Sequence, residues 1–438
     1  MRKRLTFVLA ILLSASCLFA QGNKETASTA GTGEVKGDIV FLTNRTDRDN
    51  DGTYAKLIAK FNEKYPDVKV EVQSATDYVG EMATRMQTDE YGDVCMIIDT
   101  VPTDVLGKYF LSLGTVDELV KNDGYTESYL YSKWNDGQVY GLANFCAVKG
   151  VIYNKEVFKE AGITTLPTSP DEFLKDLQLI KDNTDAIPYY TNANSGWPLD
   201  GWEDHPVGSI SGDGNYKNNI LPHDKNAFAP GSPHYVLSKL LYDIVKNGLN
   251  EADPTTCDWE ASKGMLNRGE IGCMILGSWA ISQMQAADDT PENVGYMAFP
   301  YNINGVQYAS AGTDYCFGIN KHTKYPEASR AFIDFMIKDS GWAISEGGIS
   351  LVASDPMPAG FENFDGITFV VDKPATAENL GALDAVQSES GVTLYDNGQR
   401  LNHIIDIARG VSNDTFEGYM AELNSQWAEG VTAVENEK

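Results

Sequence analysis

The chain has 438 residues, of which 42% are hydrophobic, and its 62 acidic against 34 basic side chains give a formal net charge of −28. This length exceeds one ordinary hydrophobic core, so we expect two domains or one two-lobed body. The acid excess argues against a nucleic-acid partner and against passive adhesion to anionic lipid, because both require a basic surface.

Residues 1–20 have the pattern of a signal peptide. Residues 2–4 (RKR) form a basic start, and residues 5–13 form an apolar stretch that is too short to span a bilayer. Residues 21–37 are rich in Gly, Ser, Thr and Ala, which predicts a flexible tether. The protein is therefore expected to be exported.

Two ways of processing this signal remain open. Cleavage after Ala20 would release a soluble periplasmic protein. Alternatively, residues 14–17 (SASC) resemble a bacterial lipobox, in which Cys17 would carry lipid and anchor the protein outside the cytoplasmic membrane. The match departs from the usual pattern because Ser14 occupies the place of the usual Leu.

The next segment predicts a βαβ unit. Residues 38–43 (DIVFLT) form a buried strand, and residues 68–72 alternate as a half-buried one. Between them, one face of a helix is marked by Tyr54, Leu57, Ile58 and Phe61. The two strands should be parallel, which places residues 44–52 at the edge where open α/β sheets bind ligands.

Polar side chains at this edge are candidates for ligand binding. Asp99 follows the next predicted strand, residues 94–98, and could face the same crevice. The others are Asn44, Arg45, Thr46 and Asp47. Acidic residues of the same loop match the first half of a calcium-binding loop, but Ile58 stands where the bidentate Glu is needed, so no metal site is expected.

Residues 136–162 are predicted to cross from one compact unit to another. A polar bend at Asn144 leads into the extended run 147–153. A helix follows, with Asn154 as its N-cap and Gly162 beyond its C-terminus. The segment holds no plausible nucleophile or metal cage.

The rest of the chain alternates helices, strands and loops. We expect helices to begin at Pro170 and Pro326. Residues 187–206 are rich in aromatic and Asn side chains, and residues 211–233 read as a polar, loop-rich insert. Further elements are expected at 235–245 (helix), 269–279 (strand), 294–300 and 309–319 (extended) and 415–428 (helix).

Five cysteines follow the signal. Cys95, Cys273 and Cys316 lie in apolar strand-like runs and are expected to be small core residues. Irregular spacing and the absence of a CxxC pattern give no disulfide framework, although export leaves room for one bridge.

The order of these features is similar to that of a known family. The segments that carry the resemblance are 61–70 (FNEKYPDVKV), 92–94 (GDV), 136–142 (DGQVYGL), 153–158 (YNKEVF), 170–173 (PDEF), 277–279 (GSW) and the helix at 327–337. In this order they resemble the family 1 extracellular solute-binding proteins, the maltose-binding-like receptors of bacterial ABC sugar importers.

The resemblance implies an α/β fold of the periplasmic-binding-protein, or Venus flytrap, type II-like class. Two lobes would be formed by residues 38–147 plus about 313–352 and by residues 148–312 plus about 353–438. Hinge crossings would lie near 147–151, near 311–315 and beyond Leu351. A monomer without a cofactor would close around a carbohydrate and deliver it to permease subunits in the cytoplasmic membrane.

The resemblance also places a sugar-stacking side chain at Trp279, after a Gly-Ser bend; the competing interpretation is a core residue. Trp197, in an Asn- and Gly-rich loop, is a second aromatic candidate. Asn144 and Phe145 would form the floor of the cleft, and Asp314 would lie where the lobes meet. Asn192 and Asn194 are further polar candidates.

Arg45 leaves the ligand class open. It could pair with the carboxylate or phosphate of an acidic sugar, or form an ion pair with Asp47 or Asp99. The ligand could thus be a neutral sugar, and alternatives are a polyol, a sugar phosphate or a peptide.

A secreted carbohydrate-active enzyme is the alternative from another class. Such an enzyme needs two positioned carboxylates, but nothing in the sequence singles out a pair, and no Ser–His–Asp, HExxH or P-loop signature is found. We therefore expect a binding protein and no enzyme.

Overall fold

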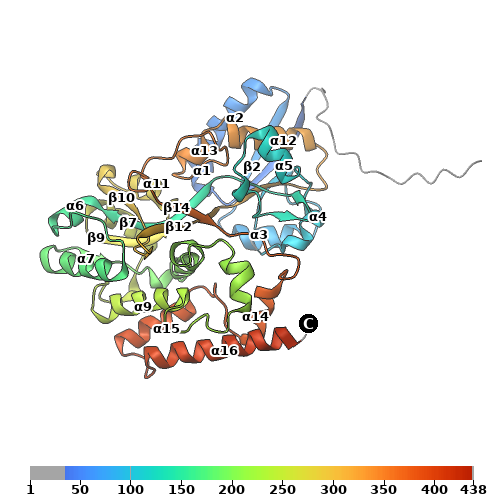
Figure 1. Cartoon of the computed structure of the whole chain (residues 1–438). Coiled ribbons are helices and arrows are strands. Elements are labelled where there is room, and N and C mark those ends of the chain that lie inside the picture. Colours follow the sequence, from blue (N-terminus) through green and yellow to red (C-terminus); the bar gives the residue numbers. More distant parts are fainter. Residues whose placement is uncertain (1–34, 99, 437–438) are drawn as a thin grey trace, which may run out of the picture. The chain divides into compact units, whose positions relative to one another are not determined.

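The computed structural model describes residues 35–98 and 100–436 (Figure 1). The predicted signal peptide, most of the tether, Cys17 and Asp99 lie outside this part of the chain. Among the described residues, no helix is both long and apolar enough to cross a membrane.

The first sheet has the strand order β2-β1-β3-β13-β6. Its strands are β1 (Gly37–Thr43), β2 (Val68–Ser74), β3 (Val94–Ile97), β6 (Leu142–Ala143) and β13 (Cys316–Ile319). β1 runs parallel to β2 and to β3, as the predicted βαβ unit requires, whereas β13 runs antiparallel to β3 and β6. The first sheet is thus completed by strands from three distant parts of the sequence.

Helices cover this sheet by packing aromatic side chains against it. The ring of Phe41 on β1 lies 5.5 Å from that of Tyr54 and 5.3 Å from that of Phe332. These partners come from α2 (Thr53–Lys64) and α12 (Pro326–Lys338). Other helices of this part are α3 (Tyr78–Arg85), α4 (Leu106–Tyr109), α5 (Val116–Asp123) and α13 (Trp342–Ser345), and a small hairpin joins β4 (Trp134–Asn135) and β5 (Gln138–Val139).

The second sheet has the order β11-β12-β7-β9-β8, with β10 also paired to β7 and β14 to β12. Its strands are β7 (Cys146–Asn154), β8 (Ile187–Tyr189), β9 (Ile271–Gly277), β10 (Val294–Ala298), β11 (Asn302–Ile303), β12 (Val306–Thr313) and β14 (Thr368–Val371). Every residue of β9 and β10 is buried, which explains their continuous apolar sequences.

Helices of the second part are α6 (Lys155–Glu160), α7 (Pro170–Asn183), α8 (Trp197–Asp200), α9 (Pro233–Lys246), α10 (Trp259–Arg268), α11 (Ala280–Gln285), α14 (Ala382–Ser390), α15 (Gln399–Arg409) and α16 (Phe416–Asn436). In Figure 1, α15 and α16 lie side by side near α9. The predicted cap at Asn154 is confirmed, since its side chain accepts a hydrogen bond from the Val157 amide. Ser169 caps α7 in the same way by accepting one from the Glu172 amide.

Three expectations about local structure need correction. Residues 44–52 are not wholly a loop, since α1 (Thr46–Asn50) forms there with two acids in its first turn, which favours a helix start. The insert at 211–233 is loop-rich, as predicted, but it also contains the helical turns Tyr216–Ile220 and Leu221–His223 and is not wholly polar, since it buries Phe228 completely. The last helix continues eight residues beyond the predicted end at Ala428, because its apolar face extends to Val431.

The chain passes between the two sheets through segments that lie against each other. Asn144 and Phe145 join β6 to β7, and Asp314 and Tyr315 join β12 to β13. The Asn144 amide donates to the Tyr315 carbonyl (3.0 Å), and the Asp314 amide donates to the Phe145 carbonyl (3.1 Å). The first connection thus precedes the expected residues 147–151, which belong to β7.

A third passage follows α13. Cys146 and Ile349 exchange two backbone hydrogen bonds of 2.8 and 2.7 Å, and the chain then continues to β14 of the second sheet. Cys146 itself is one of five free, buried cysteines in the described part of the chain; the core positions predicted for Cys95, Cys273 and Cys316 are confirmed.

Candidate functional site

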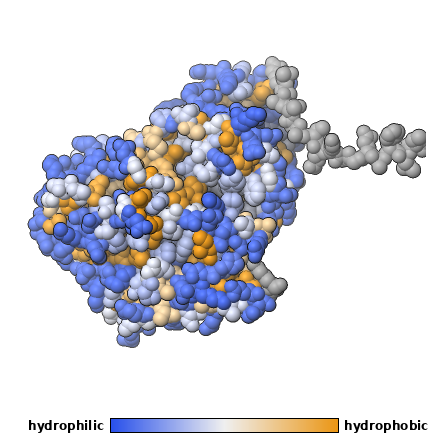
Figure 2. All heavy atoms as spheres, in the orientation of Figure 1, coloured by the Kyte–Doolittle hydropathy of each residue, from blue (hydrophilic) through white to orange (hydrophobic). Residues whose placement is uncertain are grey.

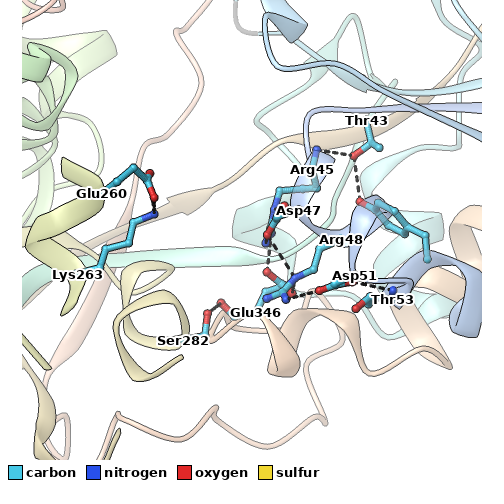
Figure 3. Close-up of polar contacts among 11 residues, drawn as sticks. Thr43, Arg45, Asp47, Arg48, Asp51, Thr53, Glu260, Lys263, Ser282 and Glu346 are labelled. Atoms are coloured by element: carbon cyan, nitrogen blue, oxygen red, sulfur yellow. Dashed lines mark hydrogen bonds and ion pairs between the residues drawn. The ribbon is translucent and has the colours of Figure 1, made fainter. Parts of the chain in front are cut away.

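A cleft of about 830 Å³ separates the loop after β1 from two helices of the second part. One wall holds four predicted site residues and Arg48: Asn44, Arg45, Thr46, Asp47 and Arg48. The opposite wall includes Trp259 and Lys263 of α10 and Ser282 of α11. Figure 3 shows the ion pair of Glu260 and Lys263 across from the Arg45 group.

Arg45 is held by carboxylates of the protein. Its Nη2 lies 2.7 Å from Asp47 Oδ2, and its Nη1 lies 2.5 Å from Glu346 Oε2. Arg48 Nε reaches the other oxygen of Glu346 at 2.9 Å (Figure 3). Because the Glu346 side chain is only 4% exposed, this buried carboxylate ties both arginines to the wall. Of the two roles considered for Arg45, the structure shows the ion pair with Asp47.

These contacts change the acidity of the groups involved. Burial lowers the pKa of Arg45, but its hydrogen bond to Asp47 and the charge of Glu346 outweigh burial and raise the pKa above its ordinary value. Burial raises the pKa of Asp47, and the bond and charge of Arg45 outweigh it, so that the pKa is lowered. Both groups are therefore charged at neutral pH.

Asn44 has an unused acceptor at this wall. Its Oδ1 is buried and makes no hydrogen bond within the described residues. Buried polar atoms are normally paired, so such an atom at the edge of a cleft suits a ligand hydroxyl. Thr46 lines the same cleft and is half-buried.

Three tryptophans, which we call the tryptophan cluster, lie together: Trp197, Trp259 and Trp279. The ring centroids are separated by 5.0 Å (Trp197–Trp259), 5.6 Å (Trp197–Trp279) and 5.9 Å (Trp259–Trp279). Trp197 is 38% exposed, and the other two are half-buried. Fully buried tryptophans such as Trp202 belong to the core, whereas this cluster presents apolar faces to solvent.

Sequence reasoning missed Trp259. It shares one helical face with Ser262 and Leu266, which are buried, and this pattern indicates a core residue. Its position at the first turn of α10 leaves the ring at the protein surface instead. Glu346 was missed as well, because nothing near it in sequence indicates its arginine partners.

Trp279 is positioned by the glycine two residues before it. A Cβ atom on Gly277 would lie 2.4 Å from Nε1 of Trp279, so only glycine allows the ring to fold back over the end of β9. Ser278 anchors the same bend, because its amide donates to the Val148 carbonyl (2.8 Å) and its Oγ accepts from the Val148 amide (3.1 Å).

The remaining predicted residues lie at the connections between the sheets. Asn144 Nδ2 donates to Asp314 Oδ2 at 3.2 Å. Burial raises the pKa of Asp314, and bonds from the Tyr315 amide and Asn144 only partly oppose this. Phe145 is 3% exposed and packs against Gly348, so its ring is part of the core.

Two asparagines considered as polar candidates are held by the protein. Asn192 is buried and donates to the sulfur of Met274. Asn194 donates to the carbonyl of Cys257. Within residues 35–98 and 100–436, no group of three or more His, Cys, Asp or Glu side chains is arranged to hold a metal ion.

A family profile described as "Bacterial extracellular solute-binding protein" matches residues 46–341. The chain belongs to this family. The solute-binding protein fold is also that of a solved structure from Bifidobacterium animalis subsp. lactis, described as a binding protein of an ABC transporter in complex with mannobiose. The two sequences are 38% identical, and the two structures superpose with a TM-score of 0.83. The match covers 91% of this chain and 95% of the other.

Two further relatives extend this comparison. A manno-oligosaccharide specific solute binding protein of the same organism, in complex with mannotriose, is 35% identical and covers 91% of this chain and 95% of its own, with a TM-score of 0.83. The "Multiple sugar-binding protein" of Streptococcus mutans is 25% identical over 342 residues, which is 75% of this chain and 77% of that protein. All three of these relatives are thus described as sugar-binding proteins or as binding proteins in complex with a sugar.

Proposed function

We propose that the protein is the substrate-binding component of an ABC importer and captures a carbohydrate in its cleft. The observation that carries this proposal is the tryptophan cluster beside a wall of ion-paired polar side chains. Sugars present C–H faces that pack on aromatic rings and hydroxyls that need hydrogen-bond partners. The relatives solved with mannobiose and mannotriose support manno-oligosaccharides as the first class to test.

Capture would use the connections between the sheets as hinges. We assign the chain up to Phe145, together with residues 314 to about 352, to one lobe, and residues 146–313 and about 353–438 to the other, because β7 and β12 belong to the second sheet. Rotation about the connections would bring the Arg45 wall toward the tryptophan cluster. A ligand drives such closure only by binding the closed form more tightly than the open one.

The closed form would then be recognised by permease subunits in the cytoplasmic membrane. We infer that the protein acts as an exported monomer, either periplasmic after removal of residues 1–20 or anchored outside the cytoplasmic membrane through Cys17. Homologues from Streptococcus pneumoniae are described as solute-binding lipoproteins, which supports the second form. We also infer that the protein is a carrier that leaves its ligand unchanged, and no enzyme, because its family and its solved relatives are binding proteins.

The decisive experiment is a binding screen with product analysis. Purified protein is tested by thermal shift and calorimetry against mannobiose, mannotriose, a polyol, a sugar phosphate and a peptide. A ligand at 100 times its Kd should stabilise the protein by about 2.7 kcal/mol. Binding of an oligosaccharide that chromatography recovers intact is expected. Release of shorter sugars would establish the enzyme alternative, and binding of only the non-sugar ligands would refute the proposal.

A further inference from the structure

A second polar group lies on the lobe that carries the tryptophan cluster. It combines side chains from β7, from the 3₁₀ turn Gly201–Asp204, from the helical turn Tyr216–Ile220, from the residue after β14 and from the loop before α15. We call it the Lys149 network, and its members are Lys149, Asp204, Lys217, Asp372 and Tyr395.

The members contact one another continuously. Lys149 Nζ lies 2.8 Å from Asp204 Oδ2, and the Tyr395 hydroxyl donates to Asp204 Oδ1 at 3.1 Å. Lys217 Nζ lies 3.5 Å from Asp372 Oδ2 and 4.9 Å from the centre of the Tyr395 ring. The network thus holds two cations, two carboxylates and one phenol, and the charges of its lysines and aspartates cancel.

The Lys149 network lies beside Trp279. Lys149 stands directly opposite Gly277 in the antiparallel pair of β7 and β9, and opposite residues point to the same face of a sheet. The direction in which a Cβ of Gly277 would point is filled by the Trp279 ring. The Lys149 side chain and the Trp279 ring therefore share one face of the second sheet.

Tyr395 is connected to the tryptophan cluster in a similar way. Its loop runs against that of Trp197, since a Cβ on Gly196 would lie 2.6 Å from the Asn397 carbonyl oxygen, and the Gly398 amide donates to Asp200 Oδ1 at 2.9 Å. The Tyr395 side chain is 40% exposed, so a ligand can reach it.

The network also lies near the connection between the sheets, because β12, which leads into Asp314, pairs with β7 at Val148, directly before Lys149. The carboxylate of Asp314, at the connection between the sheets, interacts electrostatically with both Lys149 and Arg45. Asp372 Oδ1 is buried without a hydrogen-bond partner among the described residues, so the network retains an acceptor for a further donor. A hydroxyl group supplies such a donor, whereas a carboxylate or phosphate does not.

The cations of both walls already have carboxylate partners. The pairs are Arg45–Glu346 (2.5 Å), Arg48–Glu346 (2.9 Å), Lys149–Asp204 (2.8 Å), Lys217–Asp372 (3.5 Å) and Lys263–Glu260 (2.9 Å). An anionic ligand that displaces one of these carboxylates leaves it uncompensated, which is costly for the buried Glu346. Hydroxyls can instead insert between the paired charges as donors and acceptors.

We propose that the Lys149 network is the polar wall of the ligand site and restricts the ligand to uncharged oligosaccharides. This inference rests on the proposed function and narrows its ligand class: sugar phosphates and acidic sugars are excluded because the cations that they need are paired with the protein's own acids.

The test compares two sugars that differ in charge. Calorimetry measures the affinity of the full protein for mannobiose and for a mannuronic acid disaccharide, in which carboxylates replace the terminal CH₂OH groups. The intact protein should bind the acidic disaccharide at least about 100-fold more weakly. Equal affinity for the two would overturn the inference, whereas binding of neither would contradict the proposed function itself.

Two variants then address the network directly. Asp204→Asn should lower the affinity for mannobiose at least about tenfold, because a charged acceptor is lost. It should also reduce the difference in affinity between mannobiose and the acidic disaccharide, because Lys149 loses its carboxylate partner. Tyr395→Phe keeps the ring and removes one hydroxyl, so a smaller loss of about fivefold is expected.

A matched control is Asp243→Asn, which removes the carboxylate that lies 2.6 Å from Lys239 on α9. It should leave both affinities unchanged. Thermal melts of every variant show whether the fold persists. If Asp204→Asn and Tyr395→Phe both remain folded and keep the affinities of the intact protein, the network has no part in the site.

Discussion

Trp279→Ala tests whether the tryptophan cluster holds the ligand. The ring is half-buried: one side rests over Gly277 and meets Trp197 and Trp259, while the remainder is open to solvent. A stacked sugar would cover this open face. The substitution removes that face and leaves the strand beneath it intact.

The magnitude follows from the area involved. A tryptophan side chain buries about 150–250 Å² in full, so one face corresponds to roughly 80–100 Å². At about 25 cal/mol per Å², the loss is about 2–2.5 kcal/mol, or roughly 30- to 70-fold in Kd. The unliganded protein loses two ring contacts, worth about 0.5–1.5 kcal/mol each, so its melting temperature should fall by only a few degrees.

Calorimetry with mannotriose and thermal melts without ligand measure the two effects. The matched control is Trp427→Ala on α16, whose ring is fully buried against Phe228, 5.8 Å away. This variant should lose about 3–5 kcal/mol of stability and keep its affinity wherever it remains folded. A Trp279→Ala protein whose affinity changes less than twofold would refute the assignment of the cluster to the ligand site.

Three other outcomes are expected. Gly277→Ala should lower the affinity for the sugar about as much as Trp279→Ala, because the added Cβ displaces the Trp279 ring. Fluorescence titration with the sugar measures this affinity. Glu346→Gln should lower the free energy of unfolding in urea by about 3 kcal/mol, since two arginines lose a buried partner; an unchanged midpoint would contradict this. Burial raises the pKa of Glu203, but the charges of Arg400 and His234 outweigh burial and bring the pKa to about 2. The ionised carboxylate should therefore stabilise the protein by about 3 kcal/mol above pH 4.5, and this stabilisation should be lost as the pH falls to 2. Urea titrations of Glu203→Gln at several pH values should lack this pH dependence.

The local elements were predictable because their signals lie within a few residues. The strand after the tether, the helix marked by Tyr54 and Phe61, and the capped helix after Asn154 all occur where periodicity and capping place them. The position of residues 44–47 at the edge of the first sheet was predictable as well, because these residues directly follow one strand. Its short helix was missed, because an acidic loop and an acidic helical turn have similar composition.

The contacts of the site were beyond such reasoning. Trp259 was not among the predicted site residues, because its spacing from Leu266 is that of a core face, and only the position of α10 at the cleft leaves its ring half-buried there. The Arg45–Glu346 pair joins residues 301 positions apart, and the Lys149–Asp204 pair joins two segments that share no motif.

The amino-acid sequence by itself determined the α/β alternation, the position of the stretch that connects the two sheets, and the placement of Trp279 after a glycine bend. These depend on short-range steric and hydrogen-bonding preferences that act along the chain. Tertiary structure alone decided which charges are neutralised, which tryptophans remain exposed and which acceptors stay unpaired. Those properties depend on distances between residues far apart in sequence, and it is they that make the cleft suited to an uncharged sugar.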